Sequence, residues 1–305
     1  MNFKFTKYSK FYYIASGVLV LTTIVCLFVF GLKFGIEFVG GSSMQVEFDP
    51  PAGGQRPPND TIQQALGEFD LGQITIQPTG ANGVIMQFKG IDEVTHQQIL
   101  DKLNGLVQTS EKSFQYIGPS IGQELRNKTE LAIVLALLAI TLYIAFAFRK
   151  VSRPVNSWKY GFASLIALFH DILIPIGVFS ILGKLYNVEI TIPIIAALLT
   201  VLGFSVHDTI VIFDRIRENI LRQGMAQFEE TVNWSLNQTL GRSLSTVFST
   251  LIVLATIFFF GGETLKYFSL ALIIGITSGA YSSIFIAGPL LVSWYKRDLK
   301  RAEKR

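Results

Sequence analysis

Apolar residues gather in six long stretches of the chain, and each stretch is nearly free of charge. A helix needs about 20 residues to cross the hydrocarbon core of a bilayer, and these stretches approach or exceed that length. The pattern therefore predicts a polytopic α-helical membrane protein with six transmembrane helices. The expected spans are 11–32, 129–148, 160–183, 190–213, 242–262 and 267–295.

The segment 33–128 lies between the first two spans and is too long to be a simple connector. Met44 to Phe48 alternates apolar and polar side chains, as a half-buried strand does. The later elements are predicted as a helix from Asn59 to about Phe69, strands at 73–77 and 84–88, a helix at 92–106 and a strand at 112–117. The order β-α-β-β-α-β predicts one α+β ferredoxin-like domain.

Half of the 305 residues are hydrophobic and 16% are charged, which excludes an ordinary soluble protein. Lysine and arginine gather in the N-terminus 1–10, the loop 149–159, the loop 214–241 and the tail 296–305, and basic loops stay cytoplasmic. We therefore expect both termini to be cytoplasmic and 33–128 to be extracytoplasmic, with span one retained as a signal anchor. The pI near 9.0 follows from this topology, so we expect no nucleic-acid partner.

The chain lacks the residue patterns that small-molecule chemistry requires. It has no Ser/His/Asp grouping, cysteine pair, metal-ligand cluster or phosphate-binding loop, and its one cysteine is Cys26 in span one. We place His96 on the solvated face of its helix. These observations predict that the protein is not an enzyme and binds no metal or organic cofactor.

Span four carries ionisable residues at membrane depth. Five residues spaced 3, 4, 3 and 4 apart lie along one stripe of this helix, namely Ser205, Asp208, Ile212, Arg215 and Asn219. A charge at mid-bilayer costs roughly 2.5 to 3.5 kcal/mol, so the stripe is expected to face protein or water. A short carboxylate such as Asp208 cannot reach the interface, which favours a functional role.

Span five offers a partner for Asp208. Gln238, Arg242, Ser245 and Ser249 repeat along one face, and Arg242 stands at a similar depth. An ionised Asp208 would pair with Arg242 and a protonated one would release it, which would make the pair a proton-coupled switch. The alternative is that Arg242 only extends to the cytoplasmic interface.

Other polar residues of the spans allow two interpretations. Asp214 and Arg215 either form an interfacial anchor or support a proton relay, and His207 lies on the same neighbouring stripe as Asp214. His170 and Asp171, shortly before Pro175, either make a polar contact between helices or join the relay. Separately, Gly275, Gly279 and Ser283 recur every four residues and predict a seam of close helix packing in span six.

Several motifs resemble the SecD/SecF family of bacterial protein-export membrane subunits, and the compact outer domain is similar to its SecF branch. The similar stretches are "FGIEFVGGS" at 34–42, "IGPSIGQEL" at 117–125, "ALFHDILI" at 167–174, "GFSVHDTIVIFDRIREN" at 203–219 and "QTLGRSLST" at 238–246. In the first of these, Gly35, Glu37, Phe38, Gly40 and Gly41 match the family's entry motif of the periplasmic domain, with Glu37 where aspartate is usual. His207 stands where asparagine is common.

The resemblance implies half of a resistance-nodulation-division type bundle in the bacterial cytoplasmic (inner) membrane, with SecD as the other half. It implies that protons and the membrane potential drive assistance to preproteins leaving the SecY-E-G channel. It also places the family's proton-linked aspartate at Asp208 and its arginine at Arg242. Two alternatives are a half-size exporter of lipids or small amphiphiles and a non-catalytic scaffold of the translocase.

Overall fold

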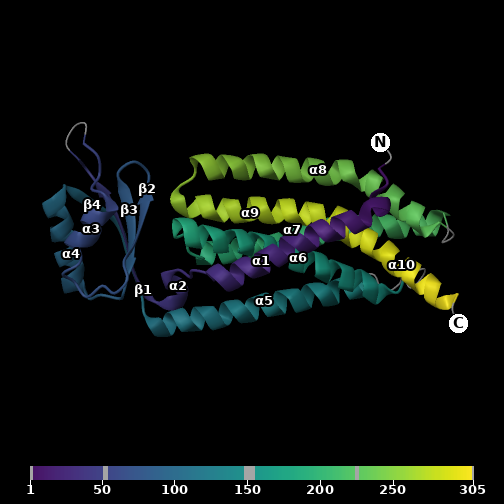
Figure 1. Ribbon diagram of the computed structural model, residues 1–305, viewed down its shortest axis with the longest axis horizontal. Coiled ribbons are helices and arrows are strands. Elements are labelled where there is room, and N and C mark those ends of the chain that lie inside the picture. Colours follow the sequence, from purple (N-terminus) through teal and green to yellow (C-terminus); the bar gives the residue numbers. More distant parts are fainter. Residues whose placement is uncertain (1–2, 51–53, 148–154, 224–226, 304–305) are drawn as a thin grey trace. The chain divides into compact units, whose positions relative to one another are not determined.

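The chain divides into two compact units, which are described separately (Figure 1). The computed structural model describes residues 3–50, 54–147, 155–223 and 227–303. The helical unit comprises 1–31, 132–181 and 193–305, and the outer domain comprises 32–131 together with 182–192. The basic residues Arg149, Lys150 and Arg153 lie outside the described residues.

Six helices of the described chain are long and apolar enough to cross a membrane, which confirms the predicted fold class. The helices are α1 (Ser9–Phe30), preceded by the short η1 (Phe5–Tyr8), α5 (Pro119–Ala147), α6 (Ser157–Tyr186), α7 (Ile192–Gln223), α8 (Phe228–Phe260), and a last span built from α9 (Glu263–Ser282), η2 (Ser283–Ala287) and α10 (Gly288–Ala302). A helix satisfies its own backbone hydrogen bonds, so it is the form that an apolar stretch of this length adopts in lipid.

Several helices extend beyond the apolar stretches that predicted them. Most of the segment 214–241, which was expected to be a loop, is helical, because α7 runs to Gln223 and α8 begins at Phe228. Its charges pair along the helix: Glu218 lies 2.5 Å from Arg215 and 2.7 Å from Arg222. Such ion pairs at spacings of three and four residues stabilise helices outside the membrane. A pattern of apolar residues does not reveal them.

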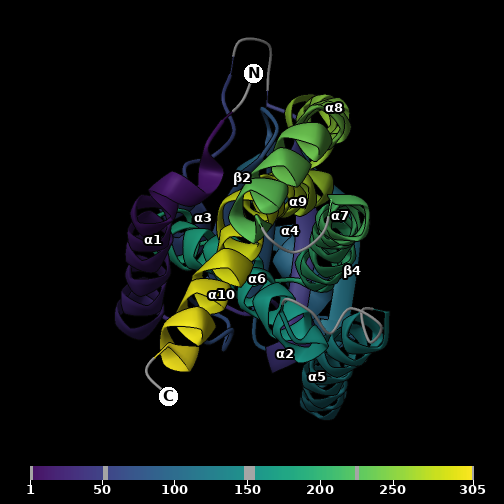
Figure 2. The ribbon, with the colours of Figure 1, turned by 90° about the vertical axis from the view of Figure 1, so that its right-hand side faces the viewer.

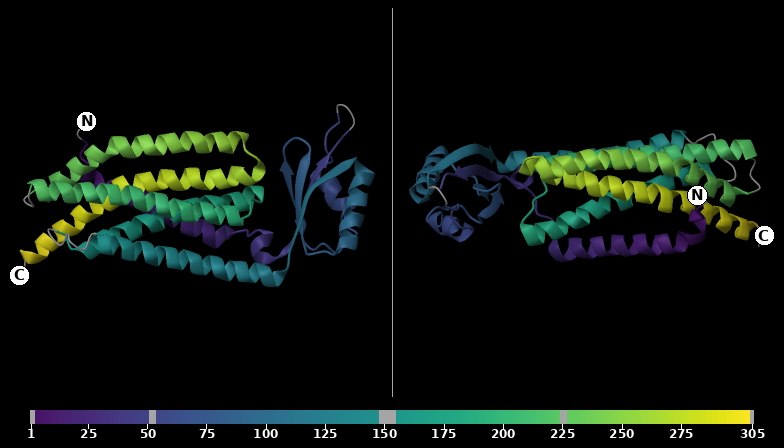
Figure 3. Two further views of the ribbon diagram at one scale, coloured as in Figure 1. Left: turned by 180° about the vertical axis from the view of Figure 1, so that it is seen from behind. Right: turned by 90° about the horizontal axis from the view of Figure 1, so that it is seen from above.

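The first and last described residues lie at the same end of the helical unit (Figures 1 and 3). There the N-terminal segment binds the start of α8: Thr6 N–H donates to Asn233 Oδ1 at 3.0 Å, and Asn237 Nδ2 donates to the Phe3 carbonyl at 2.9 Å. An even number of spans requires this arrangement of the two ends.

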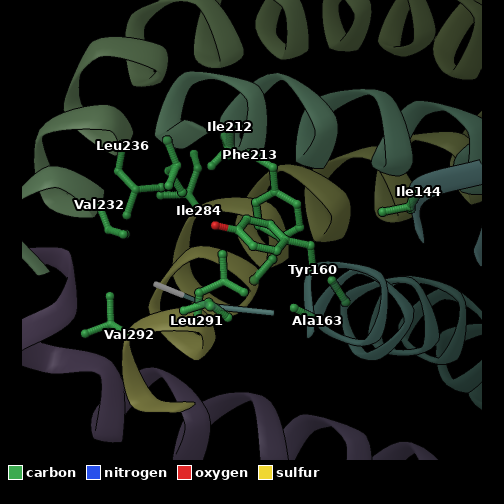
Figure 4. Close-up of a cluster of buried hydrophobic side chains, with 14 of the residues drawn as sticks. Ile144, Tyr160, Ala163, Ile212, Phe213, Val232, Leu236, Ile284, Leu291 and Val292 are labelled. Atoms are coloured by element: carbon green, nitrogen blue, oxygen red, sulfur yellow. The ribbon is translucent and has the colours of Figure 1, made fainter. Parts of the chain in front are cut away.

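The interior of the helical unit holds one large apolar core (Figure 4). Tyr160 of α6 meets Phe213 of α7 edge to face at 5.2 Å, and Ile284 and Leu291 of the last span pack against the same cluster. By contrast, α1 and α5 lie on opposite sides of the unit and expose most of their apolar side chains (Figures 2 and 3). Those exposed faces suit contact with lipid or with another membrane protein.

The outer domain is a four-stranded antiparallel sheet in the order β2-β3-β1-β4, with one helix crossing after β1 and another after β3. Its elements are α2 (Ile36–Val39), β1 (Gly41–Phe48), α3 (Asn59–Ala65), β2 (Thr75–Thr79), β3 (Gly83–Phe88), α4 (Glu93–Leu106) and β4 (Thr109–Ile117). Met44 and Val46 of β1 and Ile99 of α4 are fully buried in its core. The predicted element order is confirmed, and the short α2 is an addition.

The prediction for His96 was wrong, because this residue is only 6% exposed. Its ring stacks on Phe114 with centroids 4.0 Å apart, and its Nε2 lies 3.1 Å from a carboxylate oxygen of Glu111. The polar neighbours of His96 in sequence suggested water, but α4 turns this residue toward the sheet.

The seam of small residues in span six packs against α7. A Cβ on Gly275 would lie 2.3 Å from a methyl carbon of Val201, and one on Gly279 would lie 3.1 Å from Ser205 Cβ. Four residues further along, the Ser283 and Thr209 hydroxyls are 2.8 Å apart. The predicted seam is therefore confirmed, and its partner is α7.

The seam predicts that Gly275→Ala will destabilise the helical unit, because the added methyl has no room against Val201. Overpacking of this kind costs about 1–3 kcal/mol. Thermal unfolding of the purified chain in detergent measures the change. Gly203→Ala in α7 is the matched control, since a Cβ there has open space around it. Equal unfolding temperatures for the two variants would contradict the seam.

Candidate functional site

The polar stripe of α7 faces the interior of the helical unit, as predicted. Ser205 and Ile212 are 1% and 0% exposed, Asp208 is 8% exposed, and Asn219 is fully buried. Arg215 is half-buried at the end of the stripe. The spacing of three and four residues therefore predicted the buried face of this helix correctly.

The Asp208 carboxylate lies between α7 and α8. Its Oδ1 accepts a short hydrogen bond from the Ser243 hydroxyl of α8. Its Oδ2 is buried and has no hydrogen-bond partner among the described residues. The helices of a single chain thus bury Asp208 almost completely. One oxygen has a donor and the other is open to a proton or a second donor.

Arg242 precedes Ser243 but does not contact the carboxylate in this structure. The described residues contain no Asp208–Arg242 pair within 4.0 Å, and the Arg242 side chain is exposed. Arg242 lines a polar pocket of about 330 Å³ between α7 and α8, which is also lined by Asp214, Arg215 and Glu218. The proposed switch pair remains a prediction, and here Ser243 occupies the place expected for Arg242.

The predicted polar face of span five needs correction. Gln238, Arg242, Ser245 and Ser249 are all exposed. The buried polar residues of α8 form the adjacent stripe, with Ser235, Thr239 and Ser243 at intervals of four. That repeat was visible in the sequence. A prediction centred on Arg242 selects the exposed stripe instead, because a charged residue is poorly suited to the buried side of a helix.

A second carboxylate, Asp171 of α6, is fully buried. Its Oδ2 accepts hydrogen bonds from Ser205 Oγ at 2.5 Å and Ser282 Oγ at 2.7 Å. Its Oδ1 accepts one from Ser278 Oγ at 3.2 Å and lies 3.0 Å from His170 Nδ1. The Asp171 carboxylate thus joins α6, α7 and α9, and the expected polar contact between helices is present. Participation of His170 and Asp171 in a relay stays a prediction.

The two carboxylates are linked through α7. Ser205, which binds Asp171, precedes Asp208 by one turn of the helix, and Thr209 reaches Ser283 of the last span. Neither Ser205 nor Thr209 is more than 1% exposed. A displacement of α7 would therefore change the surroundings of Asp171 and Asp208 together.

The other candidate residues lie around this centre. His207 is exposed on α7, directly before Asp208 in the sequence. Asp214 is exposed and lies 3.7 Å from Arg217. Arg215 Nε donates to Gln238 Oε1 at 2.6 Å, which ties α7 to α8 near the polar pocket. His170 Nε2 is buried without a hydrogen-bond partner among the described residues.

The entry motif of the outer domain is a tight backbone turn. Gly40 and Gly41 have φ values of 78° and 136°, a region that side chains disfavour. A Cβ on Gly41 would lie 2.7 Å from the Phe88 carbonyl, so β1 can pair closely with β3 only with glycine there. Gly35 and Phe38 are buried in the same turn, while Glu37 is half-buried.

No cluster of three or more metal-ligating side chains occurs among the described residues. The site therefore consists of two buried carboxylates, hydroxyl donors and nearby cationic groups, arranged across helices of a membrane bundle. That combination defines a polytopic membrane protein with an intramembrane acidic site.

Comparison with known proteins gives the family. Residues 97–297 match the family model of the protein export membrane protein SecD/SecF C-terminal region, and residues 27–52 match the SecD/SecF GG motif. The chain belongs to the SecD/SecF family, and within it to the SecF subunits of the protein translocase.

Individual relatives agree over nearly the whole chain. The protein translocase subunit SecF of Thermobaculum terrenum is 44% identical across 96% of this chain and 94% of that relative. The SecF of Anaerolinea thermophila is 34% identical over the same shares. The crystal structure of SecDF from Thermus thermophilus, a translocon-associated membrane protein, is 30% identical with a TM-score of 0.85. The match covers 97% of this chain and 39% of that longer one.

The hydrogen bonds of Asp171 predict a stability effect. Asp171→Ala would leave buried hydroxyl groups of α7 and α9 without their shared acceptor, which costs about 1–3 kcal/mol. Thermal unfolding in detergent is expected to show this loss. Asp214→Ala is the control, because its carboxylate is exposed on α7 and its removal should leave stability nearly unchanged. If both variants unfold like the unmodified chain, the network does not hold the helices.

Proposed function

We propose that this chain uses the proton motive force to assist polypeptide translocation, with Asp208 as the group that takes up and releases the proton. The observation that supports this proposal is the asymmetric environment of the buried carboxylate, with Ser243 on one oxygen and, within the part of the chain that the structure describes, no hydrogen-bond partner on the other. Such a group can gain a proton without breaking its existing hydrogen bond.

Arg242 supplies the second state of the switch. It is exposed next to Ser243 and lines the pocket at the edge of α7 and α8. When Asp208 is ionised, movement of the arginine toward the carboxylate would offset the cost of a buried charge. When Asp208 carries a proton, that attraction disappears. The two protonation states therefore favour different arrangements of α7 and α8.

The available driving force is sufficient to bias such a switch. Moving one charge across 100 mV provides about 2.3 kcal/mol, before any difference in pH is added. A shift of that size changes the ratio of two conformations by more than tenfold. Because α7 also binds Asp171 through Ser205, the change would spread to α6 and α9.

The partners in this proposal follow from the family. A SecD-type subunit would cover exposed apolar faces of the helical unit, and SecY-E-G with its translocating preprotein would meet the complex from the same membrane. We place the chain in the bacterial cytoplasmic membrane with both termini cytoplasmic and the outer domain on the other side. No organic cofactor takes part, since the proton gradient is the energy source.

The proposal predicts that Asp208→Asn and Arg242→Ala remove the gradient-dependent part of late precursor translocation. Inverted membrane vesicles with an imposed proton gradient provide the assay. We expect the variants to export at the rate of unmodified vesicles treated with an uncoupler. Asp101→Asn makes the same chemical change at an exposed position of α4 and is expected to leave the gradient response intact.

Assembly with the SecD subunit is measured in the same membranes by co-purification. Gradient-driven export at the unmodified rate in both variants would reject Asp208 and Arg242 as the coupling groups. Loss of assembly would instead favour the alternative in which the polar groups act as a scaffold that fixes the partner. Loss of coupling and loss of assembly can be distinguished, because export and co-purification are both measured on each vesicle preparation.

A further inference from the structure

The loop between α6 and α7 is bound to the segment that enters the outer domain. Ile190 N–H donates to the Lys33 carbonyl at 2.7 Å, and Gly35 N–H donates to the Ile190 carbonyl at 2.9 Å. These bonds form an isolated parallel β-bridge between Phe34 and Ile190. The loop therefore belongs to the same compact unit as the outer domain.

Side chains strengthen this contact. Gln77 Nε2 of β2 donates to the Asn187 carbonyl at 2.6 Å, and Lys33 Nζ donates to Asn187 Oδ1. Asn187 itself has a φ of 55°, so the loop turns sharply where these donors meet it. We refer to the whole contact as the outer clasp, formed by Lys33, Gly35, Glu37, Gln77, Gln87 and the loop residues 187–190.

Three acceptor oxygens are buried in the outer clasp without a hydrogen-bond partner among the described residues. They are Glu37 Oε2 of α2, Gln87 Oε1 of β3 and Glu189 Oε2 of the loop. Glu37 Oε2 also fills the space beside Gly35, where a Cβ would lie only 2.4 Å away. An ionised carboxylate oxygen in such a position has lost water without gaining a donor, and a bound proton would convert it into a donor.

The charges around Glu189 act in opposite directions. Burial raises the pKa of Glu189 to about 7, donation from Gln87 and the charge of Lys33 lower it, and the charge of Glu37 raises it. Burial also raises the pKa of Glu37. Lys33 is the cation that acts on Glu189, and its ammonium group is already bound to Asn187.

We propose that Glu37 and Glu189 form a proton-binding site that controls the outer clasp. With a proton on the pair the loop stays bound to the entry segment, and with both carboxylates ionised their repulsion opens the contact. The loop continues directly into α7, the helix that carries Asp208. The site would therefore report the pH of the outer compartment to that helix, and it does not depend on Asp208 being the coupling group.

The sign of the pH dependence follows from the raised pKa. A carboxyl group that holds its proton more tightly in the closed clasp than in water stabilises the closed form fully below its ordinary pKa of 4.5. That stabilisation is lost as the pH rises through about 7. For one proton, the ratio of open to closed clasp rises up to roughly tenfold per pH unit between pH 4.5 and about 7, and it levels off above that point.

Hydrogen–deuterium exchange tests the proposal on the full chain in lipid nanodiscs. The reporters are the amide of Ile190 and a peptide that covers residues 187–192. After correction for the intrinsic exchange rate, we expect opening of the loop to increase roughly tenfold between pH 6 and pH 8. The same protection at both values would overturn the proposal.

Three variants complete the experiment. Glu189→Gln carries no charge at either pH, so its loop is expected to be protected at both. Glu37→Gln removes the neighbouring charge and is expected to move the transition to lower pH, which gives a second test if the first variant folds poorly. Glu68→Gln is the control, because its carboxylate is exposed and pairs with Lys102 at the surface. A full tenfold response retained in Glu189→Gln would also reject the site.

Discussion

A carboxylate that leaves water must be surrounded by hydrogen-bond donors, and in this protein that requirement falls on Asp171. Asp171 itself lies on α6 and its hydroxyl donors come from α7 and α9, so the three helices must keep one relative position for the network to form. The glycines of span six make this possible, because Gly279 allows α9 to approach the backbone of α7 beside Ser205. Close packing and polar satisfaction therefore depend on each other.

The helix α7 is the element that these constraints share. On one side its Ser205 and Thr209 bind Asp171 and Ser283, and on another its Asp208 accepts from Ser243 of α8. A buried, closely packed helix moves between discrete positions and does not deform gradually. A change in the protonation of Asp208 is therefore expected to shift α7 as a whole. This supports a coupling role for this helix.

Much of this arrangement could be predicted from the sequence. Apolar length located the six spans, and the spacing of Ser205, Asp208 and Asn219 located the buried face of α7. The buried face of α8 could not be chosen from periodicity alone, because two polar stripes compete and only packing selects Ser243. The same limit applies to Asp171, since its partners on α7 and α9 are distant in sequence.

The two buried aspartates differ in a way that separates their roles. Asp171 has donors on both oxygens, so adding a proton would replace an accepted hydrogen bond and disturb three helices. Asp208 has a donor on one oxygen and, among the described residues, no hydrogen-bond partner on the other. Its donor Ser243 follows Arg242, whose long side chain is exposed and lines a polar pocket between α7 and α8. The hydrogen bonding therefore supports Asp171 as the fixed structural centre and Asp208 as the group that changes its proton.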